Sequence, residues 1–402
     1  MCSVGDDIEE QENNKFMQER PKLHLAKNVC MKCELKPNVV LHNKYPYCKS
    51  CFIKSTVHKF KALLGKSRLV HPNDNVLIYH RIGHPGTALL NFLRSGLDLT
   101  TPKKIRFKPI VLFIEDQYNL SAAQRRYILE NVNKEIQYFN FPCYFISFVQ
   151  YVLHPEDLQS HTHQNYEEII INEEDALNIK SVVKKKCNLT VQQEVFKVFE
   201  QDLLIKTAKL LKCKFIFTSD LGIDIASQLL TSISLGRGSN AAFDIGTVDL
   251  RNDEVTIIRP LRNFSIKELA LYNVFNNLNP VSFLKASQNP YSSVQNLMEK
   301  FVSDLQINYP STISTIVRTG DKLSIDKNFE QNEKCPLCKV PLENTHDKLG
   351  SAEATNFSHW ASTQLPDANL SLEEQSTQLL ENFKNTCELK YCFACSQIVD
   401  FL

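Results

Sequence analysis

Four Cys-x-x-Cys pairs lie near the two ends of the chain, and no such pair occurs between them. Two thiolates separated by two residues can turn onto one tetrahedral ion, and a second pair completes the four ligands that zinc prefers. Eight of the 13 cysteines have this spacing. The sequence therefore predicts two zinc sites, with ligands Cys30, Cys33, Cys48 and Cys51 at one end and Cys335, Cys338, Cys392 and Cys395 at the other.

The ligand set leaves the metal chemistry open. Cys387 lies close to the last pair and competes as a fourth ligand of the second site. Thiolates also suit an iron–sulfur cluster, so ligand identity alone does not fix the metal. Redox pairs are an alternative for any single Cys-x-x-Cys, and a zinc-dependent protein-interaction module is an alternative for the pairs together.

The start of the chain carries no apolar targeting segment. Residues 1–20 are polar and acidic, and we expect them to form a disordered tail. No run approaches the roughly 18 apolar residues of a membrane span. An odd number of cysteines without a secretory signal favours reduced thiols. We therefore expect a cytoplasmic protein with no membrane partner.

Short apolar runs alternate with amphipathic stretches through the middle of the chain. Residues 76–79, 110–114, 143–149, 215–217 and 255–258 are predicted strands, and the segments between most of them have helical spacing. Strands separated by helices imply right-handed crossovers and a parallel sheet covered on both faces. The expected fold class is α/β, a doubly wound parallel sheet with a cysteine-rich module at each end.

Two polar segments interrupt this pattern. Residues 153–180 are predicted to be an insertion loop, in which the uneven spacing of His154, His161 and His163 favours solvent exposure over metal ligation. Residues 343–381 are predicted to be a long polar excursion between the last two cysteine pairs. The resulting domains are the tail over 1–20, an N-terminal zinc-binding module over 21–68, an α/β domain over 69–310 and a C-terminal zinc-binding module over 311–402.

Basic residues are segregated although the formal charge of +1 gives no global argument for a polyanionic partner. One basic block spans 54–68, after the first cysteine cluster, and others occur at 103–108 and 184–186. Lys59 and Lys61 are candidates for RNA binding. Solvated surface charge is the alternative.

The segment from Arg81 to Thr87 joins the first predicted strand to a helix, a place where backbone N–H groups can hold a phosphate. Gly83, Gly86 and Thr87 are the candidates for this contact. Pro85 removes one donor, so a purely structural turn is the alternative.

Three arginines are candidates for contacting RNA phosphate. Arg237 lies between two glycines after a helix, where the triplet either ends that helix or forms a loop. Arg259 and Arg262 follow the fifth predicted strand, at the carboxyl edge where open α/β sheets bind ligands. Their alternative role is to stabilise this edge of the sheet.

The cysteines in the middle of the chain are isolated from one another. Cys143 and Cys213 lie next to or within apolar strands, which predicts inert core packing. Cys187 follows a basic block that would lower the pKa of an exposed thiol, but no partner thiol or base is evident.

Six short motifs carry a family resemblance: Cys30-Met31-Lys32-Cys33, Tyr47-Cys48-Lys49-Ser50-Cys51-Phe52, Leu235-Gly236-Arg237-Gly238, Ile258-Arg259-Pro260-Leu261-Arg262, Cys335-Pro336-Leu337-Cys338 and Tyr391-Cys392-Phe393-Ala394-Cys395. In this order they resemble the cytoplasmic tRNA 2-thiolation protein 2 family, the partner subunits of the wobble-uridine thiolase. The resemblance covers most of the chain.

This resemblance implies an adenine-nucleotide hydrolase-like domain of the PP-loop type. Active members wrap a nucleotide phosphate with a Ser-Gly-Gly-x-Asp-Ser loop. The segment from Arg81 to Thr87 stands in that place without the serine or the loop aspartate, which argues against ATP binding and autonomous catalysis.

The resemblance also implies a heterodimer with a catalytic PP-loop thiolase. Its product would be 5-methoxycarbonylmethyl-2-thiouridine at the wobble position of cytoplasmic tRNA-Lys, tRNA-Glu and tRNA-Gln, with sulfur supplied by a thiocarboxylated ubiquitin-like carrier. The alternative is that this chain is itself an ATP-dependent tRNA sulfurtransferase.

Overall fold

A computed structural model describes most of the region between the two cysteine clusters, and parts of both ends. The predicted tail over 1–20, Cys187 and Cys387 fall outside the described residues. The chain divides into two compact units, residues 1–59 and residues 60–402. The described residues are 29–41, 45–67, 69–101, 104–175, 178–179, 188–282, 289–309, 311–323, 334–342, 351–363, 376–377, 391–396 and 398–399.

The first unit contains a small antiparallel hairpin and the start of a helix. Strands β1 (Val39–Leu41) and β2 (Tyr45–Tyr47) pair, and helix α2 (Lys49–Ser67) begins two residues later. The helix continues into the second unit, so the boundary lies earlier than the expected limit at residue 68. Phe60 accounts for this difference, because its ring stacks on Phe92 of the α/β body with centroids 4.8 Å apart.

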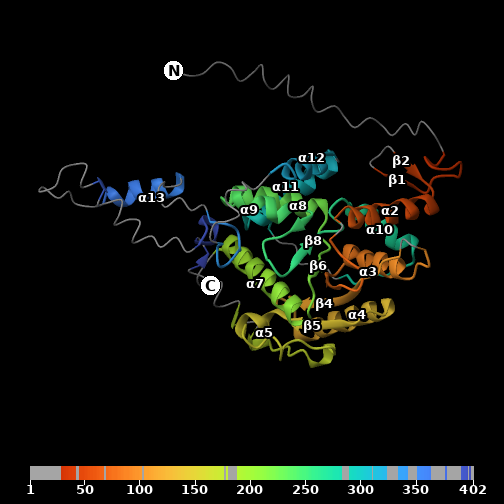
Figure 1. Ribbon diagram of the computed structural model, residues 1–402, viewed down its shortest axis with the longest axis horizontal. Helices are drawn as coiled ribbons and strands as arrows, with labels where there is room; N and C mark the ends of the chain where they lie inside the picture. The colour runs from red at the N-terminus through yellow and green to blue at the C-terminus, as the bar shows by residue number, and fades with distance from the viewer. Residues whose placement is uncertain are drawn as a thin grey trace, which may run out of the picture. The chain divides into compact units, whose positions relative to one another are not determined.

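The second unit is built on one six-stranded sheet with the order β5-β4-β3-β6-β8-β7 (Figure 1). From β3 the chain runs outward to β5 and then returns to β6, so the strand order reverses between β3 and β6. This confirms the predicted doubly wound α/β fold. The strands are β3 (Asn75–His80), β4 (Lys108–Glu115), β5 (Cys143–Ser147), β6 (Phe215–Phe217), β7 (Val248–Asp249) and β8 (Thr256–Ile258).

The strands differ from prediction at two places. The strand predicted at 143–149 ends earlier, at Ser147, because Phe148 and Val149 begin helix α5 (Phe148–Leu153). Strand β7 was not predicted, and it pairs antiparallel with β8. A strand of two residues is too short to carry an alternating pattern.

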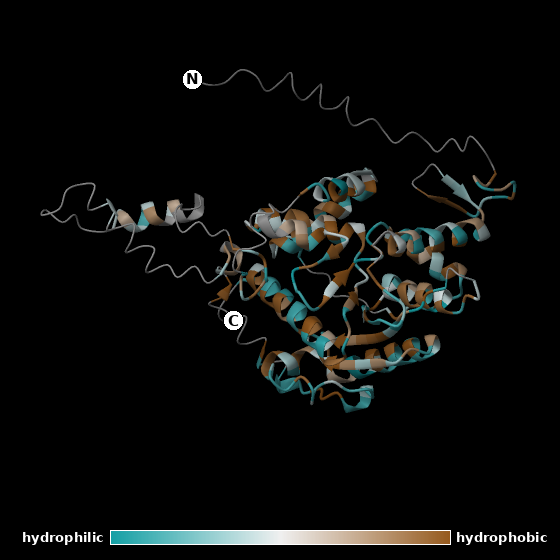
Figure 2. Cartoon of the chain, viewed as in Figure 1, coloured by the Kyte–Doolittle hydropathy of each residue, from teal (hydrophilic) through white to brown (hydrophobic). Residues whose placement is uncertain are grey.

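Apolar side chains fill both faces of the sheet, whose strands are drawn mostly in brown in Figure 2. Leu77 and Tyr79 face a cluster formed with α5 and helix α7 (Leu189–Leu210). His80, on the other face, contacts the helices α3 (His84–Leu97) and α4 (Ala122–Phe139). The predicted capping box of Ser121 and Gln124 starts α4, whose inward stripe is buried as expected.

Further helices extend the body beyond the sheet. In α12, Ile313 and Val317 join the same apolar cluster as Leu229 of α8, although the sequence placed residues 311–320 in the C-terminal module. Within the predicted polar excursion, residues 351–361 are helical. These helices are α8 (Gly222–Ser234), α9 (Gly238–Ile245), α10 (Ile266–Phe275), α11 (Val294–Asn308), α12 (Ser311–Gly320), α13 (Ser351–Ala361) and α15 (Phe393–Ser396).

The insertion at 153–180 is more ordered than a simple loop. Its His163 exchanges two backbone hydrogen bonds with Phe145 of β5, at N···O distances of 2.7 and 3.0 Å. A short 3-10 helix, η1 (Tyr166–Glu168), follows, and Ile169 is buried. None of the helices in the described part of the chain has the length and apolar character needed to cross a membrane.

Candidate metal centres and the carboxyl edge of the sheet

The two predicted cysteine tetrads are each assembled in the structure. The ligand sulfurs of Cys30, Cys33, Cys48 and Cys51 lie within 4.8 Å of one another, and so do those of Cys335, Cys338, Cys392 and Cys395. Each tetrad draws on two segments that are distant in sequence. Either set could hold one metal ion.

The hairpin and the start of α2 position the N-terminal tetrad. Cys48 directly precedes α2 and Cys51 lies in its first turn, where the helix dipole favours negative charge. Hydrogen bonds from Ser50 and from the Cys51 amide lower the pKa of Cys48 to about 6. A thiolate is the form that binds metal, so this environment prepares Cys48 as a ligand.

Two tight turns position the C-terminal tetrad. The Cys335 amide donates to the carbonyl of Val340 at 2.8 Å, which folds the first pair into a knuckle, and Lys339 closes it with a φ of 59°. Cys392 directly precedes the short helix α15, and Cys395 lies within it. The Cys392 amide donates to the sulfur of Cys335 at 3.4 Å. Hydrogen bonds from the other three thiols lower the pKa of Cys335.

The sulfur separations match a single tetrahedral ion. Cys33 Sγ lies 3.5 Å from Cys48 Sγ and 3.6 Å from Cys51 Sγ, and Cys338 Sγ lies 3.5 Å from Cys392 Sγ. A tetrahedron with Zn–S bonds of about 2.3 Å has sulfurs about 3.8 Å apart. The geometry therefore fits one ion per tetrad.

The segment from Arg81 to Thr87 forms a turn that the protein itself holds closed. The Thr87 amide donates to the Gly83 carbonyl at 3.3 Å, and its hydroxyl donates to Glu135 of α4, with the Gly83 carbonyl 3.2 Å away as a second acceptor of the same hydrogen. Asn273 of α10 donates to the carbonyl of His84 at 3.0 Å. Of the three candidate phosphate-binding residues, Thr87 is thus engaged within the fold through both its amide and its hydroxyl.

Close packing leaves little room above this turn. A Cβ on Gly86 would lie 2.0 Å from the Arg81 carbonyl oxygen and 2.9 Å from His80 Nδ1. Gly83 has a φ of 112°, a conformation that glycine tolerates best. Both glycines are therefore needed for the conformation and packing of the turn, and their role in phosphate binding stays a prediction. Sequence reasoning missed the buried partner Glu135, and its only local signal is that it directly precedes Ile136 of the apolar stripe of α4.

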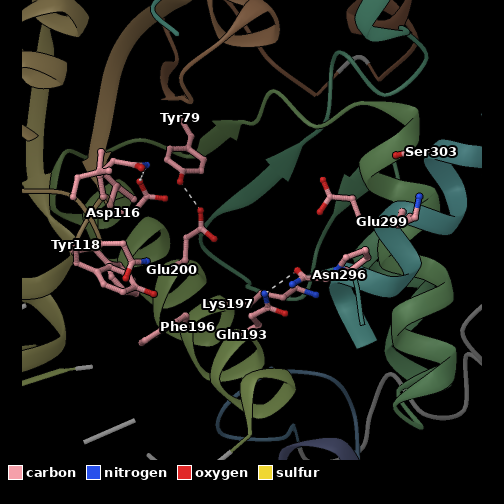
Figure 3. A pocket seen from close by; sticks show the side chains of 17 residues that line it. Tyr79, Asp116, Tyr118, Gln193, Phe196, Lys197, Glu200, Asn296, Glu299 and Ser303 are labelled. Atoms are coloured by element: carbon pink, nitrogen blue, oxygen red, sulfur yellow. Dashed lines mark hydrogen bonds between the residues drawn. The ribbon is translucent and has the colours of Figure 1, made fainter. Parts of the chain in front are cut away.

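A cavity of about 890 Å³ opens at the carboxyl ends of β3 and β4. Figure 3 shows Asp116, Tyr118 and Glu200 on one side of it, and Asn296 and Glu299 of α11 on the other. The sequence predicted ligand binding at this edge of the sheet, but not the residues that α7 and α11 contribute.

Acidic groups dominate the wall near β3. Tyr79 donates a hydrogen bond to Glu200, and Arg81 lies 3.4 Å from Asp220 at the end of β6. Desolvation raises the pKa of Glu200 and of Asp116, and Arg81 only partly offsets it.

The lysines that line the cavity are directed to carboxylates outside its lining. Lys197 lies 3.6 Å from Asp244, and Lys300 lies 3.0 Å from Asp304. Together with the acidic wall, this makes the site unfavourable for a polyphosphate.

The three candidate RNA-binding arginines are all buried, and their contacts within the chain are made with carboxylates and carbonyls. Arg259 donates to the carbonyl of Gly246 at 2.8 Å and lies 3.5 Å from Asp220. Arg262 pairs with Asp321 at 2.7 Å. Arg237 pairs with a buried glutamate of α7. Their contacts support the alternative role of stabilising the sheet edge, because none of the three residues is more than 5% exposed.

The remaining candidate residues, two lysines and two cysteines, differ in their burial. Lys59 and Lys61 are half-buried along α2, and their role in RNA binding stays a prediction. Cys213 is buried, and desolvation raises its pKa to about 11. Desolvation also raises the pKa of the half-buried Cys143. A raised pKa disfavours the reactive thiolate at both positions, and Cys213, unlike the half-buried Cys143, lies in the core as predicted.

A family model and two relatives found by sequence carry the name cytoplasmic tRNA 2-thiolation protein 2. The family model described as cytoplasmic tRNA 2-thiolation protein 2 matches residues 293–397. The protein of that name from Aedes aegypti is 30% identical over 460 residues, covering 100% of this chain and 99% of its own length. Cytoplasmic tRNA 2-thiolation protein 2-A from Xenopus laevis is 29% identical, covering 89% of this chain and 80% of its own length.

Among solved structures, the chain is similar to the U34-tRNA thiolase NcsA from Methanococcus maripaludis, which was determined with its 4Fe–4S cluster. The TM-score is 0.57 at 18% identity, and the match covers 79% of this chain and 99% of that one. This likeness confirms the α/β fold of the PP-loop type.

Proposed function

Because the chain belongs to the cytoplasmic tRNA 2-thiolation protein 2 family, we propose that it is the noncatalytic subunit of a complex that 2-thiolates wobble uridine. Membership gives the chain a role in cytoplasmic tRNA 2-thiolation. The family description also agrees with the cytoplasmic location expected from the sequence. The residues at the carboxyl edge of the sheet support the proposed division of labour within the complex.

The closed turn at the end of β3 carries the noncatalytic assignment. A PP-loop that binds nucleotide must offer free backbone N–H groups to phosphate. Here the Thr87 amide is bonded to Gly83, Pro85 has no N–H, and the Thr87 hydroxyl is held by Glu135. Pro85 therefore removes one amide from the first turn of α3, and Glu135 competes with a phosphate for the Thr87 hydroxyl.

The charge at the sheet edge points the same way. Asp116 and Glu200 line the adjoining cavity, and Asp220 faces Arg81. In their ionised form these carboxylates would repel a triphosphate. Desolvation raises the thiol pKa of Cys143 and Cys213 in the body, which disfavours the thiolate that sulfur transfer requires.

A noncatalytic subunit needs an active partner, which we propose is a catalytic PP-loop thiolase in a heterodimer with this chain. The proposed substrates are tRNA-Lys, tRNA-Glu and tRNA-Gln, whose wobble base becomes 5-methoxycarbonylmethyl-2-thiouridine. The proposed sulfur source is a thiocarboxylated ubiquitin-like carrier. The family resemblance supports these details.

We propose further that each cysteine tetrad holds one zinc ion. The donor set is four thiolates, and the sulfur separations of 3.5 and 3.6 Å suit one ion. A cluster of four irons spreads its ligands over four metal atoms and needs wider sulfur spacing. Bound zinc would cross-link two distant segments at each site and contribute directly to folding.

The test combines a cellular and a purified system. Deletion of the gene should remove the 2-thio group from wobble uridine in bulk tRNA, with the 5-methoxycarbonylmethyl group retained, and re-expression should restore it. Calorimetry with Mg–ATP should give no binding heat for the purified chain. Loss of thiolation together with ATP binding would favour the alternative, an autonomous ATP-dependent sulfurtransferase. Unchanged thiouridine would refute the role itself.

A further inference from the structure

The C-terminal tetrad is packed directly onto the α/β body. Phe243 of α9 contacts the apolar cluster formed by the cysteines, and Leu337 packs against Val195 and Val198 of α7. Figure 1 shows the ends of α7 and α9 beside the C-terminal segment. Lys334 also lies 2.8 Å from Asp253, close to the edge of the sheet. The tetrad is therefore part of the body, and its surroundings can affect any metal it holds.

Arg237 is one buried cation in these surroundings. It stands at the start of α9 and pairs with Glu194 of α7. Its Nε has no hydrogen-bond partner among the described residues, although the atom is buried. An unpaired buried donor costs about 1–3 kcal/mol, so its position implies an acceptor that is not yet accounted for. Burial opposes the charge of Arg237, but neighbouring acids, with the thiols of Cys395 and Cys338 among them, raise its pKa.

Arg251 is a second buried cation near the same thiols. Its guanidinium binds Asp249 at 2.5 and 3.0 Å and Asp244 at 2.8 Å, and its Cζ lies 5.7 Å from the centre of the Phe243 ring. That ring in turn packs against the cysteines. These contacts fix the guanidinium against Phe243, so that this ring lies between Arg251 and the tetrad.

Charge explains why such residues are needed at this site. Four thiolates and one Zn²⁺ leave about two negative charges, which are costly to bury without cationic partners. The N-terminal tetrad lies in a different setting: its cationic neighbours in sequence are the exposed Lys32 and Lys49, and no arginine occurs between Arg20 and Arg68. Two sites with the same ligands therefore differ in their surroundings.

Resting on the zinc site proposed above, we infer that Arg237 and Arg251 are positioning residues that offset the charge of the C-terminal zinc–thiolate centre. They also connect the centre to the sheet edge, since Arg251 is held by Asp249 of β7 and Arg237 by Glu194 of α7. The C-terminal zinc is then retained more firmly through these arginines, whereas zinc at the N-terminal site depends on its own module.

The experiment measures zinc content of the full chain by mass spectrometry and zinc release to a chromogenic chelator. The wild type should hold two zinc ions. Arg237→Gln and Arg251→Gln should speed release of one ion by about 10- to 100-fold, the range seen when residues surrounding the ligands of a metal site are changed. The other ion should leave at the wild-type rate, which provides an internal control. Arg94→Gln, on the exposed side of α3, is the matched control and should change neither rate.

A second variant separates charge from folding. Glu194→Gln frees Arg237 from its carboxylate and should slow release of the same ion, whereas simple loosening of the fold would speed it. Equal acceleration of both ions in the arginine variants, or faster release in Glu194→Gln, would overturn the inference. If the wild type holds two zinc ions but the arginine variants release both at the wild-type rates, the inference is also overturned. That outcome would leave the zinc proposal intact. A wild type without zinc would instead refute both.

Discussion

The hydroxyl of Thr87 donates a hydrogen bond to the carboxylate of Glu135, and both side chains are buried. This contact joins the start of α3 to α4. It occupies the hydroxyl at the very turn where a nucleotide-binding relative would hold phosphate. The turn is therefore a fixed part of the core, and substitutions in it should affect stability more than ligand binding.

We expect Gly86→Ala to lower the free energy of unfolding by about 1–3 kcal/mol, the usual cost of overpacking. The new Cβ would lie 2.0 Å from the Arg81 carbonyl, so the backbone must shift. Gly65→Ala is the matched control, because nothing lies within 4 Å of its Cβ and alanine favours a helix. Urea unfolding of both variants decides the matter. Equal effects would mean that the turn is not tightly packed.

Serine at both Cys30 and Cys33 should remove one zinc and lower the thermal stability of the N-terminal unit, because metal binding and folding are coupled. Zinc analysis and calorimetry measure the two effects. The Cys143→Ser variant should keep both zinc ions, since Cys143 lies in β5 and in neither tetrad. Retention of two zinc ions in the double variant would contradict the proposed N-terminal site.

Glu200 makes stability depend on pH. Desolvation raises its folded-state pKa above the ordinary 4.5, so the folded state holds a proton that the unfolded state releases. Stability should therefore fall as pH rises from about 4.5 through the folded pKa, with a slope of at most about 1.4 kcal/mol per pH unit. Glu200→Gln should flatten this part of the profile. Glu299→Gln, on the opposite side of the cavity, is the control, and an unchanged slope in Glu200→Gln would refute the prediction.

Arg259→Gln should destabilise the second unit by about 3–5 kcal/mol, because it leaves buried carboxylate charge with fewer partners. Arg259 lies 3.5 Å from Asp220 and 3.8 Å from Asp249. tRNA affinity per folded molecule should not change. Thermal unfolding and a binding titration on the same samples test this, with the exposed Arg318→Gln of α12 as control. A loss of affinity at unchanged stability would restore the RNA-contact role.

The sequence predicted the fold well wherever a local pattern determined it. The apolar run at 215–217 coincides with β6, and the capping box of Ser121 starts α4. Strand β7 and the bridge at His163 could not be predicted, because each depends on a partner distant in sequence.

The candidate site shows the same contrast. The spacing of the cysteines determined both tetrads, since each pair is a local motif. The burial of the Arg259 side chain depends on its contacts with Asp220 and the carbonyl of Gly246, which only the folded chain brings together. A basic residue at a strand end therefore predicts its location at the sheet edge, but not whether it faces solvent or a buried acid.

The bridge between His163 and Phe145 has a consequence for how the molecule can associate. Outer strands with free N–H and C=O groups are where sheets recruit extended peptides or aggregate. Phe145 lies in the middle of β5 and gives both of its backbone groups to His163, while β7 covers the end of β8 on the other side. Both margins of the sheet are thereby partly closed to strand addition. A stable partner is expected to engage helical or loop surfaces instead.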